Sequence, residues 1–543
     1  MVFARRSTTL LAAIIASCAM VLSLTACTSD NKTVVDGQTT VTSNSAGGVA
    51  VFTPSDGITL NQQTPLNKWA KLVPDLAKAL ADAGFKKGDI DHTTSDSLAK
   101  QSRAIQDFVV DHLSNNTTDD SGIAIAPDNM TLLVAPVVEA DVSTRQYGDY
   151  ISQNLSTNDA TDGEATSDGE SSEDDSSKDD SSNTESDSTA SDEQAQAVDR
   201  LVSSLKLAKE SGMHVVLLGN SIEGYKPDAF VKFSDAQTIG KLQAEKMVSK
   251  LKLDKASKDN PKYIEVLLPY TAVDEKGNAN DSTFAQEAFR GIWQVLGSYY
   301  QKGVVESPSG TLDGKSTEND WQAVAYDAAK EGSTAKVLDK RLAKTDGQST
   351  LTRIDGIITM NDYIASEVVK ELDDLGYTGS AADINPQITI SGIVGNITGK
   401  KDLSRDAVPD PIKSPENDNA NDSSSSDDDA DEDTSASDKD RDSQWPLVTG
   451  YGAYVSNIPS IVNGKQWMTG MEDRQTIATD IAQACAKLNK DEALNSMPSI
   501  RNSEVGGVKK IPTISEPLLA VSASNLKSAL IDPGYISLAD AGL

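Results

Sequence analysis

The chain has 543 residues and a formal net charge of −33, which excludes functions that depend on a strongly basic surface. We predict no nucleic-acid partner, because phosphate binding needs clustered Lys and Arg side chains. The negative charge is concentrated. Residues 159–193 and 416–442 together carry about 23 of the net charges, in the blocks of like charge that are typical of disordered segments. The length left over is enough for two or three ordered domains.

The first 27 residues predict an exported and anchored protein. Arg5 and Arg6 precede an apolar run over residues 10–24, and small residues lead to Cys27. This order is typical of a secretory signal. The cysteine after the small residues resembles the lipobox of bacterial lipoproteins. We therefore expect a signal peptide over 1–26, a lipid on Cys27 and a flexible tether over 27–46. The protein would be held on the extracellular face of the cell membrane. Two alternatives are an uncleaved membrane helix, for which the apolar run is short, and a secreted protein with an incidental cysteine.

Apolar runs and amphipathic patterns alternate beyond the tether. Continuous apolar runs of this length predict buried strands, and apolar residues at helical spacing predict amphipathic helices. The expected strands are 48–52, 89–93, 131–138, 214–218, 263–268, 354–360 and 387–393. The expected helices are 66–80, 96–113, 198–208, 283–301, 319–341 and 364–375.

Two acidic segments interrupt this pattern, at 157–195 and 405–443. Both are rich in Ser, Asp, Asn and Glu and have almost no apolar residues. We predict that they are disordered insertions, because they cannot bury enough surface to offset the entropy of ordering. The acidic run over 427–433 lacks the glycine and the distant glutamate of an EF-hand loop, and the three histidines are scattered. We therefore predict no metal and no cofactor.

Cysteine usage predicts a fold without disulfides. Cys18 lies in the signal and Cys27 would carry the lipid, which leaves Cys485 alone. Its helical, amphipathic surroundings favour a buried core thiol. The fold must therefore depend on its hydrophobic core.

Apolar strands separated by amphipathic helices are typical of parallel sheets covered on both faces. The sequence contains more of these strand–helix units than one small sheet can hold. We therefore predict an α/β chain with two doubly wound parallel-sheet lobes. Ligands of such sheets lie beyond the carboxyl ends of the strands.

Four segments resemble one known family. Residues 233–247, Phe-Ser-Asp-Ala-Gln-Thr-Ile-Gly-Lys-Leu-Gln-Ala-Glu-Lys-Met, look like its entry into the second lobe. Residues 354–362 look like its strand that ends in Asn-Asp. The most specific segments are 511–519, Ile-Pro-Thr-Ile-Ser-Glu-Pro-Leu-Leu, and 525–535. In order and spacing they resemble the type I periplasmic solute-binding proteins of sugar ABC importers, of the xylose and multiple-sugar type.

The resemblance implies two hinged lobes that close on a ligand, and an ABC permease that receives it. It places three crossovers near 220–230, 445–454 and 499–511. The N-terminal lobe would comprise 47–225 and 449–498, and the C-terminal lobe 226–444 and 505–543. It also implies a monomer and a carbohydrate or a related small polar molecule as ligand.

The resemblance also implies ligand contacts. Sugar hydroxyls need paired donors and acceptors, and the apolar ring face needs an aromatic platform. Trp69 has an open alternative as a core anchor of the first helix, and Asp235, Asn361 and Asp362 have an open alternative as helix caps. The matching positions are Trp69, Asn220, Asp235, Asn361, Asp362 and Asn396.

Several positions depart from the family. Val138, Ala236, Phe284 and Val394 stand where it places charged or amide side chains. A monosaccharide would lose several charge-assisted hydrogen bonds of about 1.5–3 kcal/mol each. Either the ligand is less polar than a simple sugar or the cleft has another use. We therefore expect a solute-binding protein rather than an enzyme, with a surface sensor or interaction protein as the alternative. The sequence holds no nucleophile elbow, Walker loop or dinucleotide-binding glycine motif.

Overall fold

The computed structural model describes residues 34–35, 38–39, 46–56, 65–115, 125–138, 144–151, 153–156, 184–273, 280–343, 351–381 and 444–543. The chain divides into two units, Met1–Ser45 and Ala46–Leu543. In the first unit β1 (Val34–Val35) pairs antiparallel with β2 (Gln38–Thr39), inside the predicted flexible tether. The predicted signal peptide and Cys27 lie outside the described residues. So do residues 157–183 of the first predicted acidic insertion, the whole second insertion over 405–443 and the expected strand over 387–393.

The second unit contains two parallel sheets. The first comprises β3 (Gly48–Pro54), β4 (Ile90–Ser95), β5 (Met130–Val134), β7 (His214–Leu218), β9 (Ala229–Lys232), β17 (Ile500–Val505) and β18 (Val508–Ser515). Their spatial order is β17-β18-β9-β7-β5-β3-β4. Every neighbouring pair is parallel except β17 with β18.

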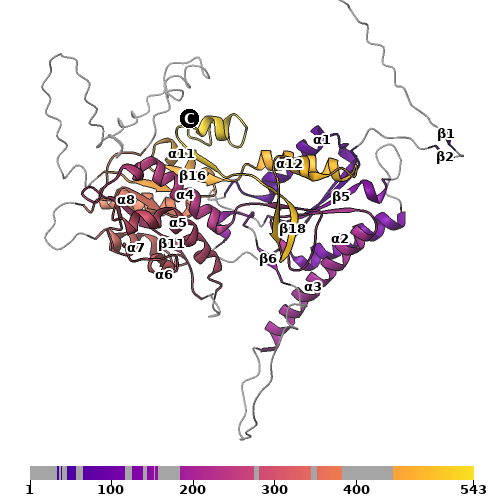
Figure 1. The fold of residues 1–543 in the computed structure, drawn as a ribbon, viewed down its shortest axis with the longest axis horizontal. Helices are drawn as coiled ribbons and strands as arrows, with labels where there is room; N and C mark the ends of the chain where they lie inside the picture. Colours follow the sequence, from indigo (N-terminus) through magenta and orange to yellow (C-terminus); the bar gives the residue numbers. More distant parts are fainter. Residues whose placement is uncertain are drawn as a thin grey trace, which may run out of the picture. The chain divides into compact units, whose positions relative to one another are not determined.

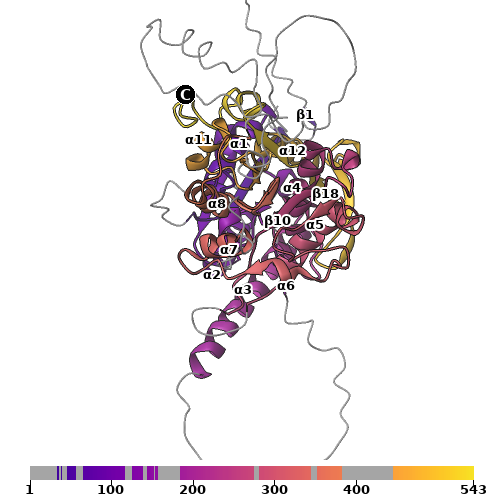
Figure 2. The same cartoon turned by 90° about the vertical axis from the view of Figure 1, so that its left-hand side faces the viewer.

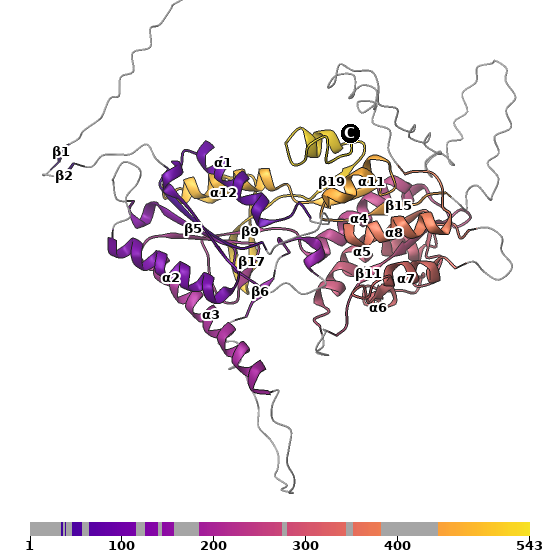
Figure 3. The same ribbon diagram turned by 180° about the vertical axis from the view of Figure 1, so that it is seen from behind.

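Helices cover both faces of the first sheet (Figure 1). On one face lie α1 (Trp69–Asp82) and α12 (Arg474–Leu488), and on the other lie α2 (Leu98–Asn115) and α3 (Thr184–Glu210). The alternation of side chains along the strands decides which helices they meet. In β3, Val49 and Val51 pack with α1 and α12, whereas Ala50 and Phe52 pack with α2 and α3. Figure 3 shows the same two helix pairs from behind.

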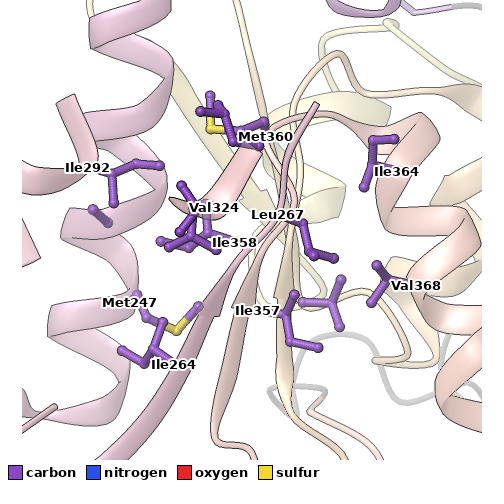
Figure 4. Packing of buried hydrophobic residues seen from close by; sticks show 14 of the residues in the cluster. Met247, Ile264, Leu267, Ile292, Val324, Ile357, Ile358, Met360, Ile364 and Val368 are labelled. Atoms are coloured by element: carbon purple, nitrogen blue, oxygen red, sulfur yellow. The ribbon is translucent and has the colours of Figure 1, made fainter. Parts of the chain in front are cut away.

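The second sheet comprises β10 (Lys262–Val266), β12 (Val305–Glu306), β14 (Gly356–Ile358) and β15 (Leu447–Thr449), in the order β12-β10-β14-β15. All its described pairs are parallel. Helices α4 (Ala236–Leu251) and α5 (Thr283–Gln301) lie on one side of β10, and α7 (Ser333–Arg341) and α8 (Asp362–Leu375) on the other (Figure 2). Figure 4 shows this core, with Ile264 and Ile358 on the side of Met247 and Ile292, and Ile357 near Val368.

Smaller elements complete the unit. The short pairs are β6 (Asn154–Leu155) with β8 (Ser221–Ile222), β11 (Leu268–Pro269) with β13 (Ala325–Tyr326), and β16 (Met468–Met471) with β19 (Leu519–Ser522). The short helices among the described residues are α6 (Trp321–Val324) and α11 (Ile458–Val462). The same residues include 3-10 turns at 87–89, 127–129, 145–147, 253–255, 455–457 and 494–496, and a π-helix over Lys527–Ile531.

Some predicted elements differ from the observed ones. The expected helix over 319–341 is divided into α6, β13 and α7, because β13 pairs with β11 and Gly332 takes a left-handed φ of 69° before α7. The expected strand over 263–268 is divided into β10 and β11. The insertion predicted over 157–195 ends earlier, because α3 begins at Thr184.

Strand pairing also shifts the predicted lobe boundaries. β9 and β18 pair with each other and belong to the first sheet, although 226–444 and 505–543 were expected in the second lobe. β15 belongs to the second sheet, and the Trp467 N–H donates to the Val448 carbonyl, which brings β16 beside β15. The chain therefore passes between the lobes near 233–235, 471–474 and 515–519. We call the first sheet with its helices the first lobe and the second sheet with its helices the second lobe.

Candidate functional site

The predicted ligand residues that the structure describes lie near the carboxyl ends of parallel strands, apart from Trp69. Asn220 follows β7, Asp235 follows β9, and Asn361 follows β14. Tyr451 follows β15 in the same way. This is the edge at which doubly wound sheets bind ligands. Asn396 lies outside the described residues, as does Cys27.

Trp69 is the first residue of α1 and is only 3% exposed. Its ring meets Tyr150 edge-on at 5.1 Å and Phe233 edge-on at 5.8 Å, and Tyr150 and Phe233 stack on each other at 4.7 Å. Its backbone N–H donates to Asp149 Oδ2 at 3.1 Å. Trp69 therefore anchors the core of the first lobe, as the alternative interpretation of this residue expects.

Asn220 uses both ends of its amide within the first lobe. Oδ1 accepts a hydrogen bond from the Gln153 N–H, and Nδ2 donates to the Pro136 carbonyl, both at 2.9 Å. These bonds hold the segments that follow β5 and precede β6 against the end of β7. One N–H and one lone pair of the amide are engaged in this way.

Asp235 caps α4, and its side chain remains 33% exposed. Oδ1 accepts from the Thr238 N–H at 2.7 Å and from Thr238 Oγ1 at 2.6 Å, and Oδ2 lies 2.8 Å from Lys232 Nζ. Burial raises the pKa of this carboxyl, but the bonds from Lys232 and Thr238 outweigh burial and leave the pKa below its ordinary value. Asp235 is therefore a charged acceptor that is both a helix cap and partly accessible.

Asn361 caps α8 and is fully buried. Its Oδ1 accepts from the Ile364 N–H at 2.9 Å, and its Nδ2 donates to Gln146 Oε1 at 3.0 Å. The preceding Met360 has a φ of 67°, an uncommon value for a residue with a side chain. The capping role is thus observed, and the amide donor points to the first lobe.

Asp362 is a buried structural carboxylate. Its Oδ1 accepts from Gln466 Nε2 at 2.7 Å, and its Oδ2 accepts from the Tyr454 N–H and from Thr469 Oγ1, both at 2.9 Å. Burial raises the pKa of Asp362 to about 6, and these hydrogen bonds oppose the rise. Because its neighbours use both oxygens, Asp362 holds the loop after β15 in place.

Glu472 is a residue that the sequence analysis missed. It is 1% exposed and lies where the chain passes from β16 to α12. Its Oε1 accepts from the Ser234 N–H at 2.6 Å and from Tyr451 Oη at 3.4 Å, and Ser234 Oγ is hydrogen-bonded to Tyr451 Oη. Burial raises the pKa of Glu472 to about 7. This carboxyl therefore joins two crossover segments to the end of β15.

The segment Thr144–Ile151 was missed as well, and we call it the strap. Gln146 accepts the hydrogen bond from Asn361, and its carbonyl accepts from Tyr454 Oη at 2.7 Å. Tyr147 is 1% exposed, and its hydroxyl has no hydrogen-bond partner among the described residues. Two tyrosines between the predicted strand over 131–138 and the predicted acidic insertion are the one sequence signal that could have drawn attention to it.

The described residues contain no group of three or more His, Cys, Asp or Glu side chains that could hold a metal ion. Within the same residues, every helix is too short or too polar for a membrane span. Cys485 is free and fully buried, as the sequence predicts, and burial raises the pKa of its thiol well above the ordinary value.

No family model matches this sequence, and no curated protein matches it. Solved structures of several ABC-transporter solute-binding proteins are similar to it. One from Clostridium phytofermentans, with bound β-D-glucose, is 17% identical, with 91% of this chain and 99% of that chain covered and a TM-score of 0.44. One from Chloroflexus aurantiacus, in complex with D-glucose, is 18% identical, with 92% and 98% covered and a TM-score of 0.43.

A third, from Actinobacillus succinogenes with bound D-allose, is 10% identical, with 89% and 99% covered and a TM-score of 0.39. All three are solute-binding proteins of transporters. The α/β architecture of this chain is established here by its own strand order and pairing.

Proposed function

We propose that this protein is an extracellular, lipid-anchored solute-binding protein that captures a carbohydrate or related small polar molecule between its lobes and delivers it to an ABC permease. One observation carries the proposal. Ser234, which follows β9 of the first sheet, is hydrogen-bonded to Tyr451, which follows β15 of the second sheet, and Gln146 of the strap accepts from Asn361, which follows β14. Three chain crossings join these lobes, which is the arrangement of a hinged clamp.

The accessible polar groups at this edge suit a polyhydroxylated guest. Asp235 is a partly exposed carboxylate beside Lys232. Asp149 and Lys68 form a second pair at 2.8 Å, with side chains 20% and 16% exposed. Carboxylates accept hydrogen bonds from hydroxyls, and ammonium groups donate to them. Such charged groups are the polar part of the chemistry that sugar binding requires.

A second candidate function is a surface sensor or interaction protein that keeps the clamp but binds no free sugar. It is favoured by the use of Asn220, Asn361 and Asp362 in hydrogen bonds within the protein. These groups hold the fold in the described state and leave fewer donors and acceptors for a guest.

Calorimetry and thermal shift of the full-length protein against pentoses, hexoses, polyols and nucleosides test the proposal. A ligand that binds the folded state raises the melting temperature by linkage. The decisive variant is Asp235→Asn, because asparagine also caps a helix well and only the charge is lost. Its matched control is Asp473→Asn, which changes the same kind of cap on α12, where Asp473 accepts from the Thr476 N–H.

We expect Asp235→Asn to weaken binding at least about tenfold, as the loss of one charge-assisted hydrogen bond implies, and Asp473→Asn to bind like the wild type. Equal binding by both variants would remove Asp235 from the site. If no compound in the panel shifts the melting temperature, the importer function fails and the sensor function is favoured.

A further inference from the structure

Part of the strap is fixed in the first lobe. The Asp149 N–H donates to the Asn67 carbonyl at 2.8 Å, and Asp149 Oδ1 pairs with Lys68 Nζ. The Tyr150 hydroxyl donates to the Lys68 carbonyl at 2.5 Å. Gly148 has a φ of 99°, and a Cβ there would collide with Asn67. This part of the strap is therefore held closely against the start of α1.

Residues on both sides of this part contact the second lobe, since Tyr147 and Ile151 both pack in its core. Gln146 Oε1 accepts from Asn361 Nδ2 at 3.0 Å, and the Gln146 carbonyl accepts from Tyr454 Oη at 2.7 Å. The Tyr147 ring lies 4.7 Å from Phe284 and 6.2 Å from Tyr451. Tyr147 packs within the hydrophobic core of the second lobe although its neighbour Asp149 is bound to the first.

These contacts join the strap to the second lobe. Asn361 stands at the carboxyl end of β14, where the proposed function places a polar ligand contact. One of the two N–H groups of its amide donates to Gln146. A guest that uses this donor must first take the place of the Gln146 side chain and offer a hydrogen-bond acceptor of its own, such as a hydroxyl oxygen.

We propose that Gln146 and Tyr147 form an intramolecular latch that holds the lobes together in the solute-free protein and that is displaced when solute binds. The inference rests on the proposed function for its second part only. A latch lowers the apparent affinity, because only the unlatched fraction of molecules is competent to bind. Binding of solute is thereby coupled to release of the strap.

The test variant is Tyr454→Phe, which removes only the hydroxyl that reaches the strap. Its matched control is Tyr300→Phe, because the Tyr300 hydroxyl donates to the Ile264 carbonyl at 2.9 Å within the second lobe. Both variants lose one buried tyrosine hydroxyl that bonds to a backbone carbonyl. A second test variant, Gln146→Ala, removes the contact with Asn361 in case Tyr454→Phe fails to fold.

Hydrogen exchange of the full-length, solute-free protein is the first measurement. The Tyr147 amide is bonded within the strap to Thr144, whereas the Asp149 amide is bonded to Asn67 in the first lobe. We expect Tyr454→Phe and Gln146→Ala to speed exchange at Tyr147 by about fivefold, the size of one net hydrogen bond, and to leave Asp149 and the control unchanged. Unchanged exchange at Tyr147 in both variants overturns the latch, as does equal acceleration in Tyr300→Phe.

Titration with any solute found in the sugar panel is the second measurement. Both latch variants should bind it about fivefold more tightly than the wild type, and weaker binding would show that the strap supports the site instead of occupying it. If the panel contains no ligand, the proposed function fails, but the exchange measurement still decides whether the latch exists.

Discussion

Replacement of Glu472 by glutamine should remove much of the pH dependence of stability. The carboxyl is buried at a crossover, and its pKa rises from 4.5 to about 7 on burial. A raised pKa means that the folded state disfavours the charged form. The contribution of Glu472 to stability is therefore fully present below pH 4.5 and is lost as the pH rises through about 7.

The magnitude follows from the shift. Each pKa unit corresponds to about 1.4 kcal/mol, so the full shift is worth about 3 kcal/mol. Most of this loss of stability occurs between about pH 5 and pH 8. Glu472→Gln keeps an oxygen that can accept from the Ser234 N–H and has no charge to gain. Its free energy of unfolding should exceed that of the wild type by more at pH 8 than at pH 5.

Urea unfolding at a series of pH values, followed by circular dichroism, measures the difference. Asp362, whose burial raises its pKa to about 6, is present in both proteins, so the difference between the two curves isolates Glu472. Glu245→Gln on α4 is the control, because its side chain is 53% exposed. Parallel curves for the wild type and Glu472→Gln from pH 5 to pH 8 would refute the reasoning.

Three further substitutions test the fold. Asp235→Ala removes the cap of α4 and should cost about 1 kcal/mol in chemical unfolding, and a loss no larger than that of an exposed alanine substitution would contradict the cap. Gly291→Ala should destabilise the protein by about 1–3 kcal/mol, because the added Cβ would collide with the Gln237 carbonyl of α4. Alanine normally favours a helix over glycine, so a raised melting temperature would show that α4 and α5 are less closely packed. Arg341→Met should cost about 3–5 kcal/mol, since Glu265 would remain buried without its cation, and a small loss would mean that Glu265 is protonated or hydrated.

Local pattern was sufficient for the elements whose neighbours lie close in sequence. The predicted helix over 283–301 coincides with α5, and the predicted strand over 214–218 coincides with β7. In both, a complete apolar face or run is present in the sequence itself. The expected helix over 319–341 fails for the opposite reason. β13 is only two residues long and exists because β11, more than fifty residues earlier, is there to pair with it.

Strand pairing explains the shifted crossovers in the same way. The pattern of side chains over 508–515 is compatible with either lobe, because an alternation of apolar and polar residues does not determine which strand is the pairing partner. β18 takes its place from a parallel register with β9, in which Ile514 lies opposite Val231. That register depends on the tertiary structure. The sequence could therefore indicate that the chain passes between the lobes in this region, but not at which residues.

The candidate site shows where residue-by-residue reasoning stops. Asp235 and Asn361 were identified from the resemblance, with helix capping as the alternative, and both do cap helices. The partner of the Asn361 donor could not be found in this way, because Gln146 lies 215 residues earlier in a loop without periodicity. For a polar side chain at a strand end, the sequence predicts the position in the fold but not the hydrogen-bond partner. Whether Asn361 is available to a guest therefore depends on how firmly Gln146 holds it, and the exchange rate of the Tyr147 amide measures that directly.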